Sequence, residues 1–117
     1  MEVVREIGYK AGGYESLVVD NTAGGVGFTA AEIRPTSGDF LGKAAQRVEI
    51  TVENQSVRYT KDGTVPVSGV ASAVTHGHLV AAGGTITLKH PKDISNFLAI
   101  SIDGTDAWLR STFMFEN

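Results

Sequence analysis

The sequence contains no cysteine and only three prolines among its 117 residues. The lack of thiols excludes disulfide bonds, zinc–thiolate sites and cysteine nucleophiles together. Charge is also modest: 20% of the residues are charged, the net charge is −3, and lysine and arginine form no cluster. Because a phosphate backbone requires a basic surface on its partner, we expect no nucleic-acid partner.

Long apolar runs are missing as well. No stretch reaches the roughly 20 apolar residues of a membrane-spanning helix, so we expect no membrane partner. Residues 1–10 carry charged side chains and no apolar core, which argues against a signal peptide. No long segment has helical periodicity, and residues 42–47 hold one helical turn at most. We therefore expect a strand-rich protein that is made and folded in a cytoplasm.

The composition that remains is typical of one globular domain with many tight turns, since 42% of the residues are hydrophobic and 14 are glycine. We assign residues 1–117 to this single domain. Its glycine-rich first part predicts a flexible or docking arm over residues 1–13 and a strand over residues 14–19. A flexible connection follows at 23–28, and then a short strand at 30–34 that Pro35 stops.

Residues 47–53 alternate between polar and apolar side chains, which predicts a strand with one buried and one wet face. Residues 56–60 continue the alternation after Asn54-Gln55. A two-residue hairpin there would place Val52 opposite Val57 and Ile50 opposite Tyr59, with the Arg58 side chain among the carboxylates of the wet face. A wider corner between two sheets is the alternative, because Asn-Gln is a weaker turn signal than Asn-Gly.

Further turn signals separate the remaining strands. We predict a sharp turn at 61–64, a loop or edge at 65–75, and a hairpin of strands 78–80 and 85–88 around Ala82-Gly83-Gly84. A last pair, 94–102 and 107–115, is joined by 103–105, so that Leu98, Ile100 and Ile102 share a face with Ala107 and Leu109. The pattern predicts an all-β antiparallel sandwich, immunoglobulin-like or jelly-roll-like, with seven to nine short strands and an extended glycine-rich N-terminal arm.

The final predicted strand is apolar on both faces. Phe113 and Phe115 lie on one side, while Trp108 and Met114 place large apolar groups on the other. A strand with one wet face does not show this pattern. Either the strand is covered on both sides within the domain, which we favour, or its second face meets another subunit.

Three histidines are the only candidates for a metal site. His76 and His78 would share a strand face, and His90 would be the third ligand of a three-histidine zinc site. Nothing in the sequence brings the third imidazole near the other two, and Gly77 favours a loop. We interpret His76 and His78 as two loop histidines, one of them hydrogen-bonded to backbone, and expect no metal and no cofactor.

No arrangement of residues indicates an enzyme. Glu49 and Glu53 lie on one wet strand face beside Arg58, which favours surface ion pairs over a glycosidase pair. Asp62, Asp103 and Asp106 fit turns, and no G-x-S-x-G motif accompanies the serines. We expect no catalytic residues.

Two segments of the chain resemble those of known families. The segment VRYTKDGTVP (57–66) resembles a turn of the immunoglobulin-like modules that are appended to chitobiases. A broader likeness, over about residues 14–115, is to small virion structural proteins of tailed bacteriophages. It rests on TAGGVGFTAAE (22–32), ITVE (50–53), the RYTKDGT turn (58–64), GHL (77–79), AGGTITL (82–88) and the closing strand from AWL (107–109) to Phe115. Pro66-Val67 departs from the family's Pro-Thr, and the loop at 67–75 is longer than its pattern.

The phage resemblance implies a non-enzymatic virion component, made in the bacterial host cytoplasm, that docks as a decoration, neck or tail protein. Its partners would be major capsid, portal, neck or tail subunits, and it would form a symmetric homo-oligomer or a repeated array. The docking surfaces would be the N-terminal arm, the loop at 67–75 and the outer face of the Trp108 strand. The alternative function is a carbohydrate-binding module with an aromatic platform, for which the candidates are Tyr9, Tyr14, Tyr59 and Trp108.

Overall fold

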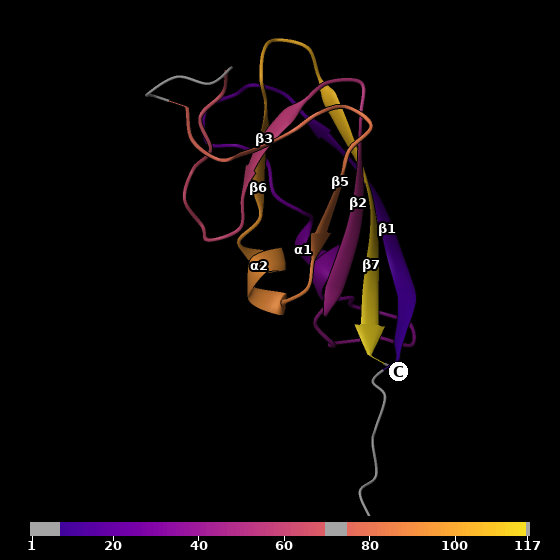
Figure 1. Cartoon of the computed structure of the whole chain (residues 1–117). Coiled ribbons are helices and arrows are strands. Elements are labelled where there is room, and N and C mark those ends of the chain that lie inside the picture. The colour runs from indigo at the N-terminus through magenta and orange to yellow at the C-terminus, as the bar shows by residue number, and fades with distance from the viewer. Residues whose placement is uncertain (1–7, 70–74, 117) are drawn as a thin grey trace, which may run out of the picture.

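The structure is a computed structural model that describes residues 8–69 and 75–116. Its elements, in chain order, are β1 (Tyr9–Val19), α1 (Ala30–Ile33), β2 (Arg47–Glu53), β3 (Val57–Thr60), β4 (His78–Val80), β5 (Thr85–Leu88), α2 (Pro91–Ser95), β6 (Leu98–Ser101) and β7 (Ala107–Glu116). The strands form a four-stranded sheet in the order β1-β7-β2-β5 and a three-stranded sheet in the order β4-β3-β6 (Figure 1). Every pair of neighbouring strands is antiparallel. The predicted all-β sandwich is confirmed.

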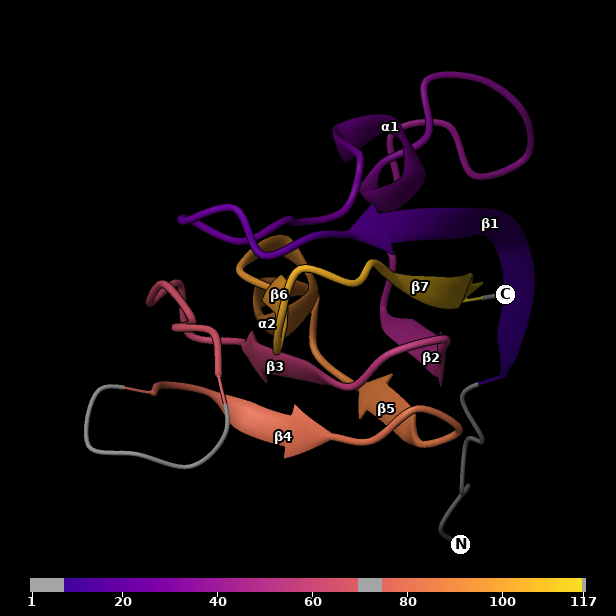
Figure 2. The ribbon, with the colours of Figure 1, turned by 90° about the horizontal axis from the view of Figure 1, so that it is seen from above.

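The core lies between the two sheets and follows the alternation of the strands. In β2 the inward side chains of Val48, Ile50 and Val52 are buried, and the polar residues between them face outward as predicted. β7 alternates in the same way over its whole length, with Phe113 and Phe115 fully buried. Burying this apolar surface stabilises the fold by roughly 25 cal/mol per Å². Seen from above, the two sheets form two layers (Figure 2).

β2 and β3 do not form a hairpin, and the predicted register between them is wrong. Ile50 pairs with Ile86 and Ser111 in the larger sheet, whereas Tyr59 pairs with His78 and Ala99 in the smaller one. The chain turns between the sheets at Asn54, whose φ is +74°, a conformation that asparagine tolerates better than most residues. The Asn54 side chain donates a hydrogen bond of 2.7 Å to the carbonyl of Asp106. The alternative of a wider corner is therefore the correct one.

The two later predicted hairpins are crossings between sheets as well. β4 pairs with β3, whereas β5 pairs with β2. In the connection between β4 and β5, the backbones of Gly83 and Gly84 form hydrogen bonds with the backbone of Val52. β6 pairs with β3, and β7 with β1 and β2, so the predicted shared face of residues 98–102 and 107–109 is wrong. A turn sequence of this kind reverses the chain equally well within one sheet or from one sheet to the other.

Both helices occupy segments that were predicted as strand. α2 takes the start of the predicted strand 94–102, since Pro91 is well suited to the first helical turn and the Nδ1 atom of His90 accepts a hydrogen bond of 3.1 Å from the Lys92 backbone. α1 replaces the predicted strand 30–34, with a backbone hydrogen bond from Arg34 to Ala30. Strand propensity is context-dependent, and one turn of helix carries Ile33 towards the core instead.

The glycine-rich connection at 23–28 is held to the core. Val26 forms an antiparallel bridge with Ala99, with hydrogen bonds of 2.8 and 2.9 Å. The Phe28 ring stacks on Phe97 at 4.8 Å between centroids and meets Phe113 edge-on at 5.0 Å. This connection therefore closes one side of the sandwich.

β1 begins at Tyr9 and not at the predicted residue 14. Residues 9–13, which the sequence assigned to the arm, are part of a strand that pairs with the end of β7. Gly12 is required there, because a Cβ atom would lie 2.6 Å from the rings of Phe115 and Phe40. Residues 1–7 of the predicted arm lie outside the described residues.

β3 and β6 each end in a turn of the same type. At Thr60–Thr64 and again at Ser101–Thr105, the hydroxyl of the first residue donates to the carbonyl of the last. The central aspartate accepts a hydrogen bond from the backbone N–H of the last residue, at 3.0 Å for Asp62 and 2.8 Å for Asp103. Because β3 and β6 are antiparallel neighbours, the two turns lie at opposite ends of the smaller sheet. The prediction that these aspartates belong to turns is confirmed.

Neither helix of the described residues is long and apolar enough to cross a membrane.

Candidate functional site

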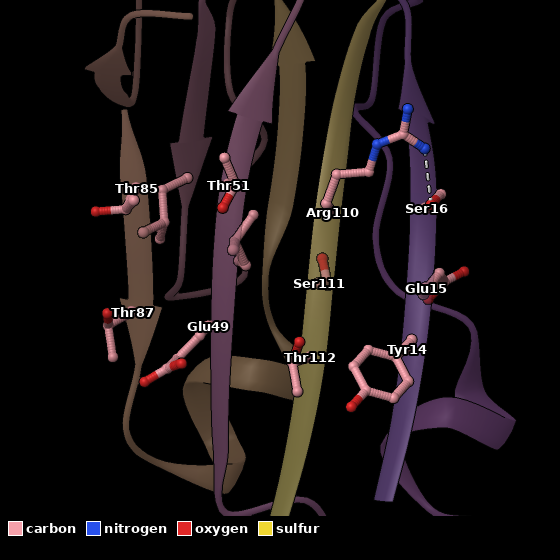
Figure 3. Close-up of a pocket in the computed structure, with 12 residues that line it drawn as sticks. Tyr14, Glu15, Ser16, Glu49, Thr51, Thr85, Thr87, Arg110, Ser111 and Thr112 are labelled. Atoms are coloured by element: carbon pink, nitrogen blue, oxygen red, sulfur yellow. Dashed lines mark hydrogen bonds between the residues drawn. The ribbon is translucent and has the colours of Figure 1, made fainter. Parts of the chain in front are cut away.

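A shallow groove of about 520 Å³ crosses the outer face of the larger sheet, on the side away from the core (Figure 3). Strand pairing brings its lining together from four strands that are distant in the sequence. The outward side chains along it are Tyr14, Ser16, Glu49, Thr51, Thr85, Thr87, Arg110 and Thr112. We call this surface the sheet groove.

Arg110 lies at the centre of the sheet groove and is held in place by its neighbours. Its Nε atom is 2.6 Å from the Glu53 carboxylate, and its Nη1 atom donates to the Ser16 hydroxyl at 2.9 Å. Its Cζ atom is 5.1 Å from the centroid of the Trp108 ring, which is a cation–π arrangement. Arg110 is thus the arginine of a neighbouring strand that pairs with a β2 carboxylate, and the prediction of this role for Arg58 is wrong.

Aromatic side chains mark two points on this face. Tyr14 is 72% exposed, and Trp108 is 41% exposed beside its cross-strand neighbour Val18. No part of the described chain buries Trp108, so the interpretation that β7 is covered on both sides within the domain is wrong. A second hollow, of about 700 Å³, lies between Trp108 and Gly83 and meets the sheet groove at Thr51.

The threonines of the sheet groove have free hydroxyl groups. Among the described residues, no side-chain hydrogen bond engages the four of them: Thr51, Thr85, Thr87 and Thr112. Each hydroxyl offers one donor and two acceptor positions to a ligand. The sheet groove therefore combines unengaged hydroxyls with one guanidinium that is paired with a carboxylate.

The other candidate surface lies on the outer side of the smaller sheet and depends on Arg58. This side chain is only 7% exposed; its Nε atom donates to the carbonyl of Gly69 at 2.8 Å and its Nη1 atom to that of Gly77 at 3.0 Å. The Ser68 hydroxyl adds a bond of 2.7 Å to the carbonyl of Ser101. Arg58 thereby fastens the chain on both sides of residues 70–74 onto the sheet.

Apolar side chains are exposed on and beside this fastened loop. Val65 is 50% exposed, Val67 is 40% exposed, and Leu79 of β4, which pairs with Arg58, is 55% exposed. We call these three residues the loop surface. Its position matches the predicted functional loop at 67–75 in part, since residues 70–74 lie outside the described residues.

The structure does not bring the three histidines together at a metal site. The Nε2 atom of His76 is 2.9 Å from the Thr64 hydroxyl, the His78 ring lies 5.5 Å from that of Tyr59, and His90 caps α2. Among the described residues no group of three potential ligands could hold a metal ion.

The predicted carboxylates and aromatics also separate. Glu49 lies 3.5 Å from Arg47, and Glu53 pairs with Arg110, so each carboxylate has its own arginine. Tyr59 packs against Phe97 at 5.7 Å, and Tyr9 lies at the far end of β1 opposite Glu116. Of the four aromatic candidates, Tyr14 lines the sheet groove and Trp108 the adjoining hollow.

The titration of the Asp62 carboxylate should report on the turn at Thr60–Thr64. Hydrogen bonds from the hydroxyl and then the backbone of Thr64 hold the pKa of Asp62 below its usual value of 3.8. We expect Thr64→Val to move the pKa of Asp62 back towards that value. A lowered folded-state pKa adds stability above pH 3.8 that is lost as the pH falls through the folded-state pKa, so the stability gap between the wild type and the variant should narrow in acid.

Carboxyl ¹³C NMR titration measures this directly. Thr105→Val changes the same position of the second turn and serves as the matched control, because it leaves the environment of Asp62 intact. An Asp62 pKa that is equal in the wild type and in Thr64→Val would contradict the assignment.

Comparison of the chain with protein-family models, curated proteins and solved structures gives no match.

Proposed function

We propose that this chain is a non-enzymatic structural component of a tailed-bacteriophage virion, which docks onto the particle through the loop surface. The observation that carries the proposal is the buried Arg58, which holds the backbone at Gly69 and Gly77 against the outside of the smaller sheet, next to exposed apolar side chains. Exposed apolar groups that lie together are typical of contact sites. Backbone that is already held in place at Gly69 and Gly77 loses little conformational entropy on docking, so more of the contact energy appears as affinity.

The likeness to phage virion proteins supports the same proposal from another direction. The RYTKDGT segment that carries the likeness contains Arg58, which fastens the loop, and Asp62, which shapes the turn that leads into it. The motif thus contains residues that support the loop surface, although Val65, Val67 and Leu79 themselves lie outside it. Repetition of one contact over a symmetric particle turns a weak site into stable occupancy.

Particles that lack this protein provide the test. We expect purified wild-type protein to co-sediment with them, and the double variant Val67→Glu, Leu79→Glu to bind at least about tenfold more weakly, because two charges would enter an apolar contact. Thr87→Glu places a charge on the opposite face and is the matched control, expected to bind like the wild type. Circular dichroism checks that each variant is folded. Failure of the wild type to bind the particles, or equal binding by the wild type and the double variant, would contradict the proposal.

A further inference from the structure

We propose that the sheet groove is a binding site for a neutral oligosaccharide. The inference rests on residues that the proposed docking does not use, since the loop surface lies on the other outer face of the sandwich. A docked protein would then present the sheet groove away from the contact. Three features of the sheet groove support the assignment: its aromatic rings, its hydroxyl groups and its charge.

The aromatic rings suit the faces of sugar rings. Tyr14 projects from β1 beside Thr112 (Figure 3), and most of its surface is exposed. Trp108 lies further along β7, in the hollow that adjoins the sheet groove. Tyrosine and tryptophan offer large, rigid contact areas with few rotatable bonds, so little entropy is lost when a ligand packs on them. The Arg110 guanidinium lies over the Trp108 ring at 5.1 Å, so Tyr14 offers the more open ring. Two rings on one face suit an extended ligand more than a compact one.

The hydroxyl groups suit the edges of sugar rings. Thr51, Thr85 and Thr87 stand side by side on β2 and β5, with Thr51 paired directly to Thr85. Their hydroxyls, like that of Thr112, have no partner in the described part of the chain. Sugar hydroxyls, like these, both donate and accept, so the two sets can satisfy each other in several registers.

The charges favour a neutral ligand. The Arg110 guanidinium forms an ion pair with the Glu53 carboxylate, so its charge is already balanced within the protein. Glu49 projects into the same space and lies 3.5 Å from Arg47, so its charge too is balanced by a charge of the protein. An apolar peptide anchor has no deep apolar pocket here, because the outward side chains are mostly polar.

Titration with neutral hexasaccharides tests the inference. The panel consists of cellohexaose, xylohexaose, mannohexaose, maltohexaose and chitohexaose, with a hexauronate as the anionic comparator. Trp108 is the only tryptophan, so its fluorescence reports on this face alone. We expect at least one neutral member to change that fluorescence and to shift the amide NMR signals of Tyr14, Thr51 and Arg110. Tyr14→Ala should then weaken binding about tenfold, whereas Tyr9→Ala, an exposed tyrosine of the same strand outside the sheet groove, should not.

Several outcomes would overturn the inference. These are no response to any neutral member, tighter binding of the hexauronate, or equal affinity of the wild type and Tyr14→Ala. Binding of the same variants to particles is measured in parallel. Tyr14→Ala should keep full particle binding, so a failure of sugar binding and a failure of the proposed docking are told apart.

Discussion

Replacing Arg58 with alanine is expected to lower the free energy of unfolding by about 3 kcal/mol. The variant loses two charge-assisted hydrogen bonds and leaves the carbonyls of Gly69 and Gly77 without their donor at a site from which water is largely excluded. Arg58→Lys should recover only part of the loss, because one ammonium group cannot reach two carbonyls in the fork geometry of a guanidinium. Urea unfolding followed by circular dichroism measures all three proteins.

Arg110→Ala is the matched control for this experiment. Its side chain is 45% exposed, so its ion pair with Glu53 should contribute less than about 1 kcal/mol to stability. An Arg58→Ala variant that is no less stable than Arg110→Ala would mean that Arg58 does not fasten the loop. If the loop surface docks onto particles, Arg58→Ala should also weaken that binding under conditions in which the variant is still folded.

Gly77→Ala is expected to produce the second large loss of stability, about 3 kcal/mol in total. Gly77 has a φ of +109°, which alanine adopts only under strain. Its new Cβ atom would also lie 3.0 Å from the carbonyl oxygen of Tyr59 and 3.3 Å from its backbone nitrogen. These atoms belong to β3, which pairs on both sides and cannot easily yield.

Gly83→Ala separates the two causes. Gly83 has a similar φ of +90°, but nothing lies within 4 Å of the position that its Cβ atom would take. This variant should lose only the part that comes from backbone strain, about 1 kcal/mol, so the difference between the two variants measures the contact with β3. Equal losses would show that the contact with Tyr59 adds nothing.

The sequence identified some parts of the candidate surfaces and missed others for definite reasons. Trp108 stood out because a large apolar residue on the wet side of an alternating strand breaks the pattern, and it is indeed exposed. Arg58 was predicted to lie beside the β2 carboxylates, a position that Arg110 takes, because only the strand pairing shows which arginine lies next to β2. The threonine row was missed; its signal is the repeat of outward threonines at 85 and 87.

The turns show most clearly what the local sequence cannot determine. Each predicted hairpin has suitable turn residues, yet the chain changes sheet at residues 54–56, 81–84 and 102–106. The energy that decides between a hairpin and a crossing comes from the burial of both strands against distant partners. The few residues of the turn do not indicate which partners those are.

Trp108 and Arg58 illustrate which features the sequence determined and which only the tertiary structure decided. The alternation of side chains by itself determined the strand class and the buried faces of β2 and β7, because a period of two is a property of each strand alone. The local turn residues likewise determined the aspartate turns. Only the tertiary structure decided that β1, β7, β2 and β5 lie side by side to form the sheet groove, and that Arg58 is buried beneath a loop. These arrangements depend on contacts between residues far apart in the chain, which form only when two complete sheets bury their inner faces against each other.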